Sequence, residues 1–82
     1  DSAPFVAALE RAGVEARHAL HIGDHPVDDV QGAREAGLHT LWFNRHGKPW
    51  ADSAAPDGEV RCLSEIPAWL ESYVLRLNQS QA

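Results

Sequence analysis

The spacing of apolar residues along the chain predicts an alternation of helices and strands. After Ser2 and Pro4, which favour a helix start, apolar side chains recur every three or four positions up to Gly13 and predict a helix over about 3–12. The segment HALHIG, residues 18–23, clusters its apolar residues and stops at a glycine. This pattern favours a short buried strand.

The following stretch returns to helical spacing and then to a strand. From Asp28 the apolar residues keep a helical period up to Gly37, with acidic residues in the first turn. HTLWFN, residues 39–44, is β-branched and aromatic and predicts a second strand. A strand, a helix and a strand within about 25 residues form a βαβ unit, which requires a parallel sheet. We therefore predict an α/β fold, with helices flanking a short parallel sheet.

The second half of the chain begins with a loop. Residues 45–58 are dense in Gly, Pro, Ser and Asp, and a short strand is expected at about 59–62. Ser64 is then expected to cap a helix. The apolar stripe of that helix comprises Ile66, Leu70, Tyr73, Val74 and Leu77. Cys62, between strand and helix, is expected to be a small buried side chain.

Two or three strands are few for a sheet of this kind. Strands buried on both faces need neighbours on both edges, so we expect the edge of the 18–23 strand to be covered by the rest of a longer chain or by a second copy. The sequence contains no methionine. We therefore expect it to be a cleaved, truncated or partly recorded piece of a longer protein.

Composition narrows the class of protein further. The 82 residues make one domain at most, and no apolar run approaches the ~18 residues of a membrane span. A net charge of −5 with seven Lys and Arg argues against a nucleic-acid surface. The single cysteine excludes an intramolecular disulfide, and the N-terminus lacks the pattern of a signal peptide. These features favour a reducing, cytoplasmic compartment.

Titratable side chains crowd the turn that follows the first predicted strand. Asp24, His25, Asp28 and Asp29 lie within six positions of Gly23. Carboxylates placed so close repel one another unless a cation or solvent compensates them. Ligands of parallel α/β sheets bind beyond the carboxyl ends of the strands, and two convergent carboxylates there are hard oxygen ligands for Mg²⁺. We predict Asp24 and Asp29 as the metal-binding residues.

Simpler roles compete with this interpretation. Asp28 or its neighbour can cap the following helix and favour its dipole, a role that fits Asp28 best. The segment HIGDH also offers His21, Asp24 and His25 to Zn²⁺ or Ni²⁺, but His21 belongs to the strand face while Asp24 leads off the strand end. The strand geometry therefore disfavours a zinc or nickel site.

The loop RHGKPW carries three basic side chains. Arg45, His46 and Lys48 could face a phosphate, but a solvated loop with Trp50 packed back on the domain is the stronger expectation. Core packing is the default for the other two tryptophans, Trp42 and Trp69.

As a composite, HIGDHPVDDVQGAREAGLHTLWFNR resembles the fourth motif and flanking βαβ unit of the haloacid dehalogenase (HAD) superfamily of phosphohydrolases. The shared features are a hydrophobic strand, Gly-Asp, four residues, Asp, and a helix that reads Gly-Ala-x-x-Ala-Gly. The WFNR strand resembles the flavin-mononucleotide and sugar-phosphate phosphatase branch. The resemblance implies that residues 1–82 are the C-terminal part of a Rossmann-like core domain, a partial three-layer sandwich.

The resemblance also implies roles for individual residues. Asp24 matches the family's direct Mg²⁺ ligand, Asp29 matches the acid that supports the ion or its waters, and Asp28 falls on a variable position. The family's lysine would precede Asp1, and its Asp-x-Asp nucleophile motif does not occur in this sequence. We expect a Mg²⁺-dependent phosphatase that acts on a small phosphorylated metabolite through an aspartyl-phosphate. This chain alone is expected to be inactive.

Other functions remain open. The family also contains dehalogenases, which need no metal and typically carry a Ser-Asn pattern where this sequence has Gly23 and Asp24, so the acidic version favours phosphate esters. Alternatively, the chain is a non-catalytic assembly module that pairs through its exposed strand edge, as a homodimer or with the remainder of a parent chain. A receiver-like signalling domain fits less well, because such domains place their acidic pocket on different strands.

Overall fold

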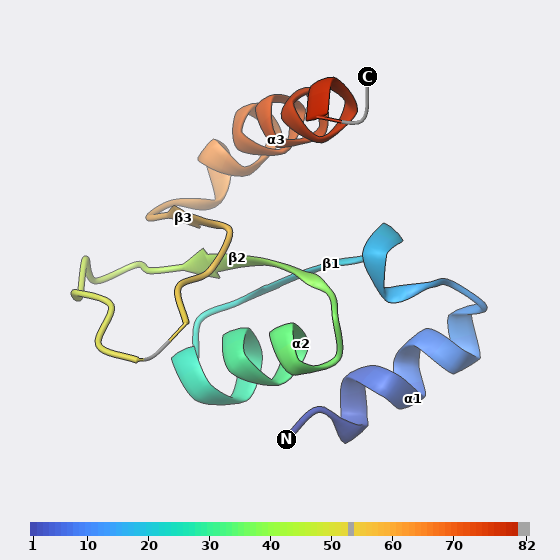
Figure 1. Cartoon of the computed structure of the whole chain (residues 1–82). Coiled ribbons are helices and arrows are strands. Elements are labelled where there is room, and N and C mark those ends of the chain that lie inside the picture. Colours follow the sequence, from blue (N-terminus) through green and yellow to red (C-terminus); the bar gives the residue numbers. More distant parts are fainter. Residues whose placement is uncertain (53, 81–82) are drawn as a thin grey trace.

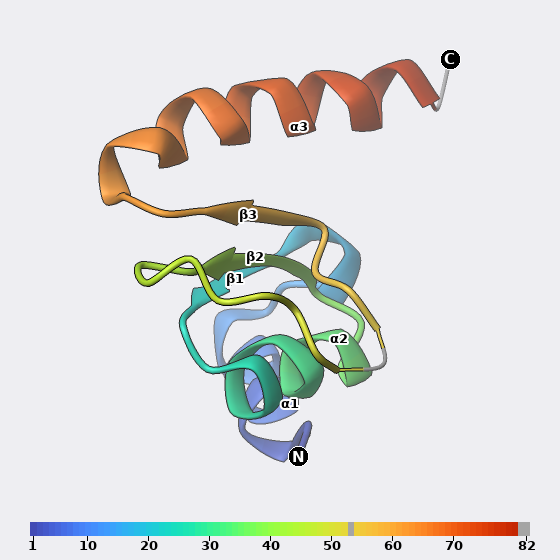
Figure 2. The ribbon, with the colours of Figure 1, turned by 90° about the vertical axis from the view of Figure 1, so that its left-hand side faces the viewer.

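The computed structural model describes residues 1–52 and 54–80 and shows three layers (Figure 1). The parallel sheet has the order β1 (Leu20–Gly23), β2 (His39–Phe43) and β3 (Gly58–Val60). The main helices are α1 (Ala3–Ala12), α2 (Gly32–Glu35) and α3 (Ile66–Ser80). Figures 1 and 2 show α1 and α2 on one side of the sheet and α3 on the other. The predicted α/β sandwich with a short parallel sheet is confirmed.

The first helix has the bounds that the sequence predicts. Gly13 ends α1 in the left-handed conformation, with φ at 67°, which a glycine adopts without steric cost. The strand that follows is shorter than HALHIG, because Ala16–His18 form a 3₁₀ turn and pairing begins only at Leu20.

The helix after β1 begins earlier than Asp28. A π-helical segment, Pro26–Gln31, leads directly into α2, and the capping residue is His25, whose Nδ1 accepts a hydrogen bond from the Asp28 backbone N–H at 3.0 Å. The prediction of Asp28 as the cap is therefore wrong. A proline favours the first position of a helix because it lacks the N–H that would otherwise be unpaired there.

The core lies around the central strand. Leu41 and Trp42 of β2 are almost fully buried, together with Val60 of β3 and Val30 and Ala33 of the helix below the sheet. A strand with neighbours on both edges and helices on both faces has no exposed side, which explains why residues 40–42 are buried without alternation. The prediction that Trp42 belongs to the core is confirmed.

The connection into α3 differs from the prediction. A 3₁₀ turn, Leu63–Glu65, precedes the helix. Cys62, rather than Ser64, is the capping residue of this turn, and the Glu65 side chain in return accepts from the Cys62 N–H at 2.9 Å. Cys62 is exposed, so its predicted burial is wrong. Trp69 packs where a Cβ on Gly58 would collide with its indole, which fixes α3 against β3.

Each outer strand of the sheet, β1 and β3, pairs on one side only within the described residues. Within the described residues β1 pairs with β2 alone, and the Ile22 side chain on β1 is 38% exposed. A groove of about 390 Å³ next to β1 is lined in part by Leu20, Leu70 and Val74. Leu70 and Val74 belong to the predicted apolar stripe of α3, yet both are exposed. None of the described helices has the length and apolar character needed to cross a membrane.

Candidate metal centre

The acidic turn lies at the carboxyl end of β1, where the sequence places it. Gly23 is the last residue of the strand, Asp24 follows it, and the π-helical segment starts at Pro26. A Cβ on Gly23 would collide with the carboxyl group of Asp29. The absence of a side chain at Gly23 is therefore what lets Asp29 reach back over the strand end.

Both oxygens of the Asp29 carboxylate accept hydrogen bonds. Oδ1 lies 2.9 Å from His21 Nε2, and Oδ2 accepts from the backbone N–H of His25 at 2.9 Å. Burial pushes the pKa of Asp29 upward, but the bonds from His21 and His25 and the nearby His21 charge outweigh burial and leave that pKa below its usual value. Asp29 is thus held as a carboxylate.

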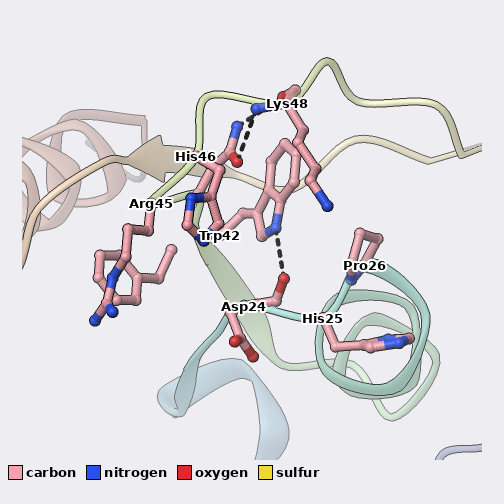
Figure 3. Close-up of a pocket in the computed structure, with 9 residues that line it drawn as sticks. Asp24, His25, Pro26, Trp42, Arg45, His46 and Lys48 are labelled. Atoms are coloured by element: carbon pink, nitrogen blue, oxygen red, sulfur yellow. Dashed lines mark hydrogen bonds between the residues drawn. The ribbon is translucent and has the colours of Figure 1, made fainter.

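Asp24 is arranged differently. Its backbone carbonyl accepts a hydrogen bond from the Trp42 indole N–H at 3.0 Å, and Figure 3 shows its carboxylate turned away from that indole. The residue is exposed, and among residues 1–52 and 54–80 no hydrogen bond or ion pair engages its carboxylate. Asp24 therefore offers an uncommitted carboxylate at the strand end.

This donor set fits a Mg²⁺ site in part. The Asp24 carboxylate can bind a hard cation directly, whereas Asp29, with both oxygens already bonded, fits a role toward the ion's waters. The described part of the chain contains no group of three or more His, Cys, Asp or Glu placed to hold a metal. The side chain of Asp28 is 79% exposed and its Oδ2 lies 3.7 Å from His25 Nδ1; within the described residues it makes no hydrogen bond with Asp24 or Asp29.

A pocket of about 440 Å³ opens beside Asp24 (Figure 3). The basic side chains of Arg45, His46 and Lys48 line it, together with Trp42. The guanidinium of Arg45 lies 5.3 Å from the centre of the Phe43 ring. The basic loop is therefore part of the pocket wall. Trp50 of the same loop packs against Trp42, as predicted, with ring centroids 5.0 Å apart.

Sequence reasoning missed Asn44, which shapes this wall. Asn44 is 4% exposed; its amide donates to the Lys48 carbonyl at 2.7 Å and accepts from the Lys48 N–H at 3.0 Å. The same amide group donates to Glu59 at 2.8 Å. An asparagine directly after a buried strand was the available signal, since buried amides need partners that a local turn can supply.

Comparisons with known proteins show the family of this chain. The HAD-hydrolase-like family model matches residues 2–60. Phosphoserine phosphatase of Thermus thermophilus is 40% identical over 62 residues, which are 76% of this chain and 25% of that protein. N-acylneuraminate-9-phosphatase of Mus musculus is 32% identical over 78 residues, 93% of this chain and 32% of that protein.

Two solved structures extend the comparison. A 2-haloacid dehalogenase from Pseudomonas syringae superposes with a TM-score of 0.83 and 46% identity, over 89% of this chain and 32% of that one. The putative HAD-hydrolase YfnB from Bacillus subtilis, bound to magnesium, gives a TM-score of 0.75 and 37% identity, over 80% and 29%. The chain belongs to the HAD-like hydrolases. It spans about a quarter to a third of the length of these relatives.

Proposed function

We propose that this chain supplies the metal-side acids of a Mg²⁺-dependent phosphohydrolase that acts on small phosphorylated metabolites. The observation that carries the proposal is the pair of carboxylates at the end of β1: Asp24 is uncommitted, and Asp29 is held beside it by two hydrogen bonds. Phosphatases among the relatives and a magnesium-bound neighbour support the same reading. A reducing compartment such as the cytoplasm agrees with the single cysteine.

The chemistry divides between this chain and groups outside it. When bound, Mg²⁺ would neutralise charge on the phosphoryl oxygens. Asp24 would offer it a carboxylate oxygen, while Asp29 keeps the turn in place. The aspartyl-phosphate intermediate needs a nucleophilic aspartate, and no Asp-x-Asp motif occurs in residues 1–82.

The division of labour has a direct test. The isolated 82-residue chain should release no phosphate from 4-nitrophenyl phosphate at any Mg²⁺ concentration, because it lacks the nucleophile. Mg²⁺-dependent phosphate release by the isolated chain, lost in Asp24→Asn, would show that these residues hold a complete site and would overturn this part of the proposal.

Dehalogenation is the second candidate, favoured by the 46% identity to the 2-haloacid dehalogenase. The carboxylate at Asp24 supports phosphate chemistry instead, because a metal ligand has no use in a metal-independent displacement of halide. Chelation separates the two functions in the protein that carries this chain. Phosphate release should stop in EDTA and return with Mg²⁺, whereas chloride release from 2-chloropropionate that persists in EDTA would identify a dehalogenase.

A further inference from the structure

We propose that His21 is a positioning residue of the metal site, which fixes Asp29 and through it the backbone that carries Asp24. The inference rests on the proposed function, because it assigns Asp24 to the ion. The inference assigns a role to His21, which lies one strand position before Ile22 and takes no part in the expected chemistry.

The peptide unit between Asp24 and His25 is held at both ends. Its carbonyl oxygen accepts from the Trp42 indole at 3.0 Å, and its N–H donates to Asp29 Oδ2 at 2.9 Å. A peptide plane anchored at its oxygen and at its nitrogen cannot rotate freely. The direction in which the Asp24 side chain leaves the backbone is thereby set before any ligand arrives.

Asp29 can hold that N–H only if its own carboxylate is fixed. A carboxylate accepts hydrogen bonds and cannot donate, so His21 Nε2 carries the proton and donates to Oδ1 at 2.9 Å. With one oxygen bonded to strand β1 and the other to the turn, rotation of the carboxyl group is blocked. Without His21, Oδ1 loses the donor at 2.9 Å, and the Asp29 carboxylate is less firmly held in the orientation that bonds His25.

The His21 ring is itself clamped by the first helix. Phe5 of α1 meets it edge to face, with ring centroids 4.7 Å apart and an interplanar angle of 76°. Phe5 reaches this position because Gly32 has no side chain, since a Cβ there would collide with the Phe5 ring. A continuous set of contacts therefore runs from α1 through His21 and Asp29 to the peptide after Asp24.

The two His21 substitutions that test this role differ in length by one methylene group. Glutamine places an amide nitrogen near the site of the histidine Nε2 and can still donate to Asp29, whereas the shorter asparagine cannot reach it. The probe is Mn²⁺, which takes the same oxygen ligands as Mg²⁺ and whose binding is followed by electron paramagnetic resonance. Affinity and melting temperature are measured on the whole protein that carries this chain.

We expect His21→Asn to weaken Mn²⁺ binding about tenfold or more, as losses around metal ligands commonly do, and His21→Gln to stay within about threefold of the wild type. His39→Asn is the matched control, because the His39 ring is also hydrogen-bonded, to Tyr73 and the Arg17 carbonyl, but lies at the amino end of β2, away from Asp24. It should lower the melting temperature without changing Mn²⁺ affinity.

The outcomes separate the two proposals. Equal Mn²⁺ affinities for His21→Asn and His21→Gln, with Asp24→Asn failing to bind, would overturn the role of His21 and leave the metal site intact. Wild-type affinity in Asp24→Asn would overturn the metal site itself and the role of His21 with it. A parallel fall of affinity and stability in both His21 variants and in His39→Asn would reduce His21 to a structural residue.

Discussion

Asp24 and Asp29 are separated by four residues and have opposite surroundings. Asp29 is bonded through both oxygens, while the Asp24 carboxylate is exposed and turned from its neighbour Trp42 (Figure 3). The spacing of the two acids could be predicted from the sequence. Their division of labour could not, because it depends on Gly23 leaving room for a carboxyl group and on a histidine ring from the strand.

Gly23→Ala tests this close approach. The added methyl group collides with the Asp29 carboxyl, so we expect the free energy of unfolding to fall by about 1–3 kcal/mol and Mn²⁺ affinity to fall with it. Gly13→Ala is the control: a Cβ there meets nothing within 4 Å, although the positive φ of 67° strains it. Chemical denaturation and Mn²⁺ titration should show a stability loss in both variants and an affinity loss only in Gly23→Ala.

At the scale of elements, period and turn chemistry located the strands β1 to β3 and the helices α1, α2 and α3 to within a few residues, but not the 3₁₀ turns Ala16–His18 and Leu63–Glu65. Two of the misplaced boundaries, at the start of the π-helical segment and before α3, lie at capping residues. His25 caps the π-helical segment and Cys62 caps the turn before α3, and neither is among the residues that usually lead such positions. The exposed Leu70 and Val74 show that an apolar stripe predicts a helix face without predicting what covers it.

A hydrogen-bonded chain through His39 adds to the packing of Trp69 in attaching α3 to the sheet. His39 Nε2 donates to the Arg17 carbonyl at 2.9 Å, and His39 Nδ1 is hydrogen-bonded to the Tyr73 hydroxyl, with 2.6 Å between the atoms. Burial first, and then the Asp57 carboxylate, raise the pKa of Tyr73 above its usual 10.0. The folded state therefore favours the neutral phenol.

Tyr73→Phe should lower the free energy of unfolding by about 1 kcal/mol at neutral pH, the usual worth of one hydrogen bond. A raised pKa contributes stability that is complete below pH 10.0 and is lost as the pH rises through the folded value. The difference in unfolding free energy between the wild type and Tyr73→Phe should therefore narrow above pH 10.0. Urea denaturation below and above this pH measures the unfolding free energies of the wild type and Tyr73→Phe, with Ser72→Ala on the exposed side of α3 as a control. A difference in unfolding free energy that does not change with pH would contradict the prediction.

At the scale of the whole molecule, this chain provides part of an architecture. It spans a quarter to a third of its relatives, its sheet has an open edge at β1, and a groove lined in part by apolar side chains lies beside that edge. The open edge was predictable from the small number of strands. Whether a second copy or further chain covers it remains a prediction, since coverage depends on residues outside this sequence.

We propose that Asp24 binds Mg²⁺ for phosphate ester hydrolysis, and Asp28 offers a matched control with the same charge four residues away. The most direct measurement is kcat/KM for 4-nitrophenyl phosphate at saturating Mg²⁺ in the protein that carries this chain. Asp24→Asn should lower it more than about 100-fold, beyond the usual effect of a residue that only supports a metal ligand, while Asp28→Asn stays near the wild type. Equal activity of the two variants would contradict the assignment of Asp24.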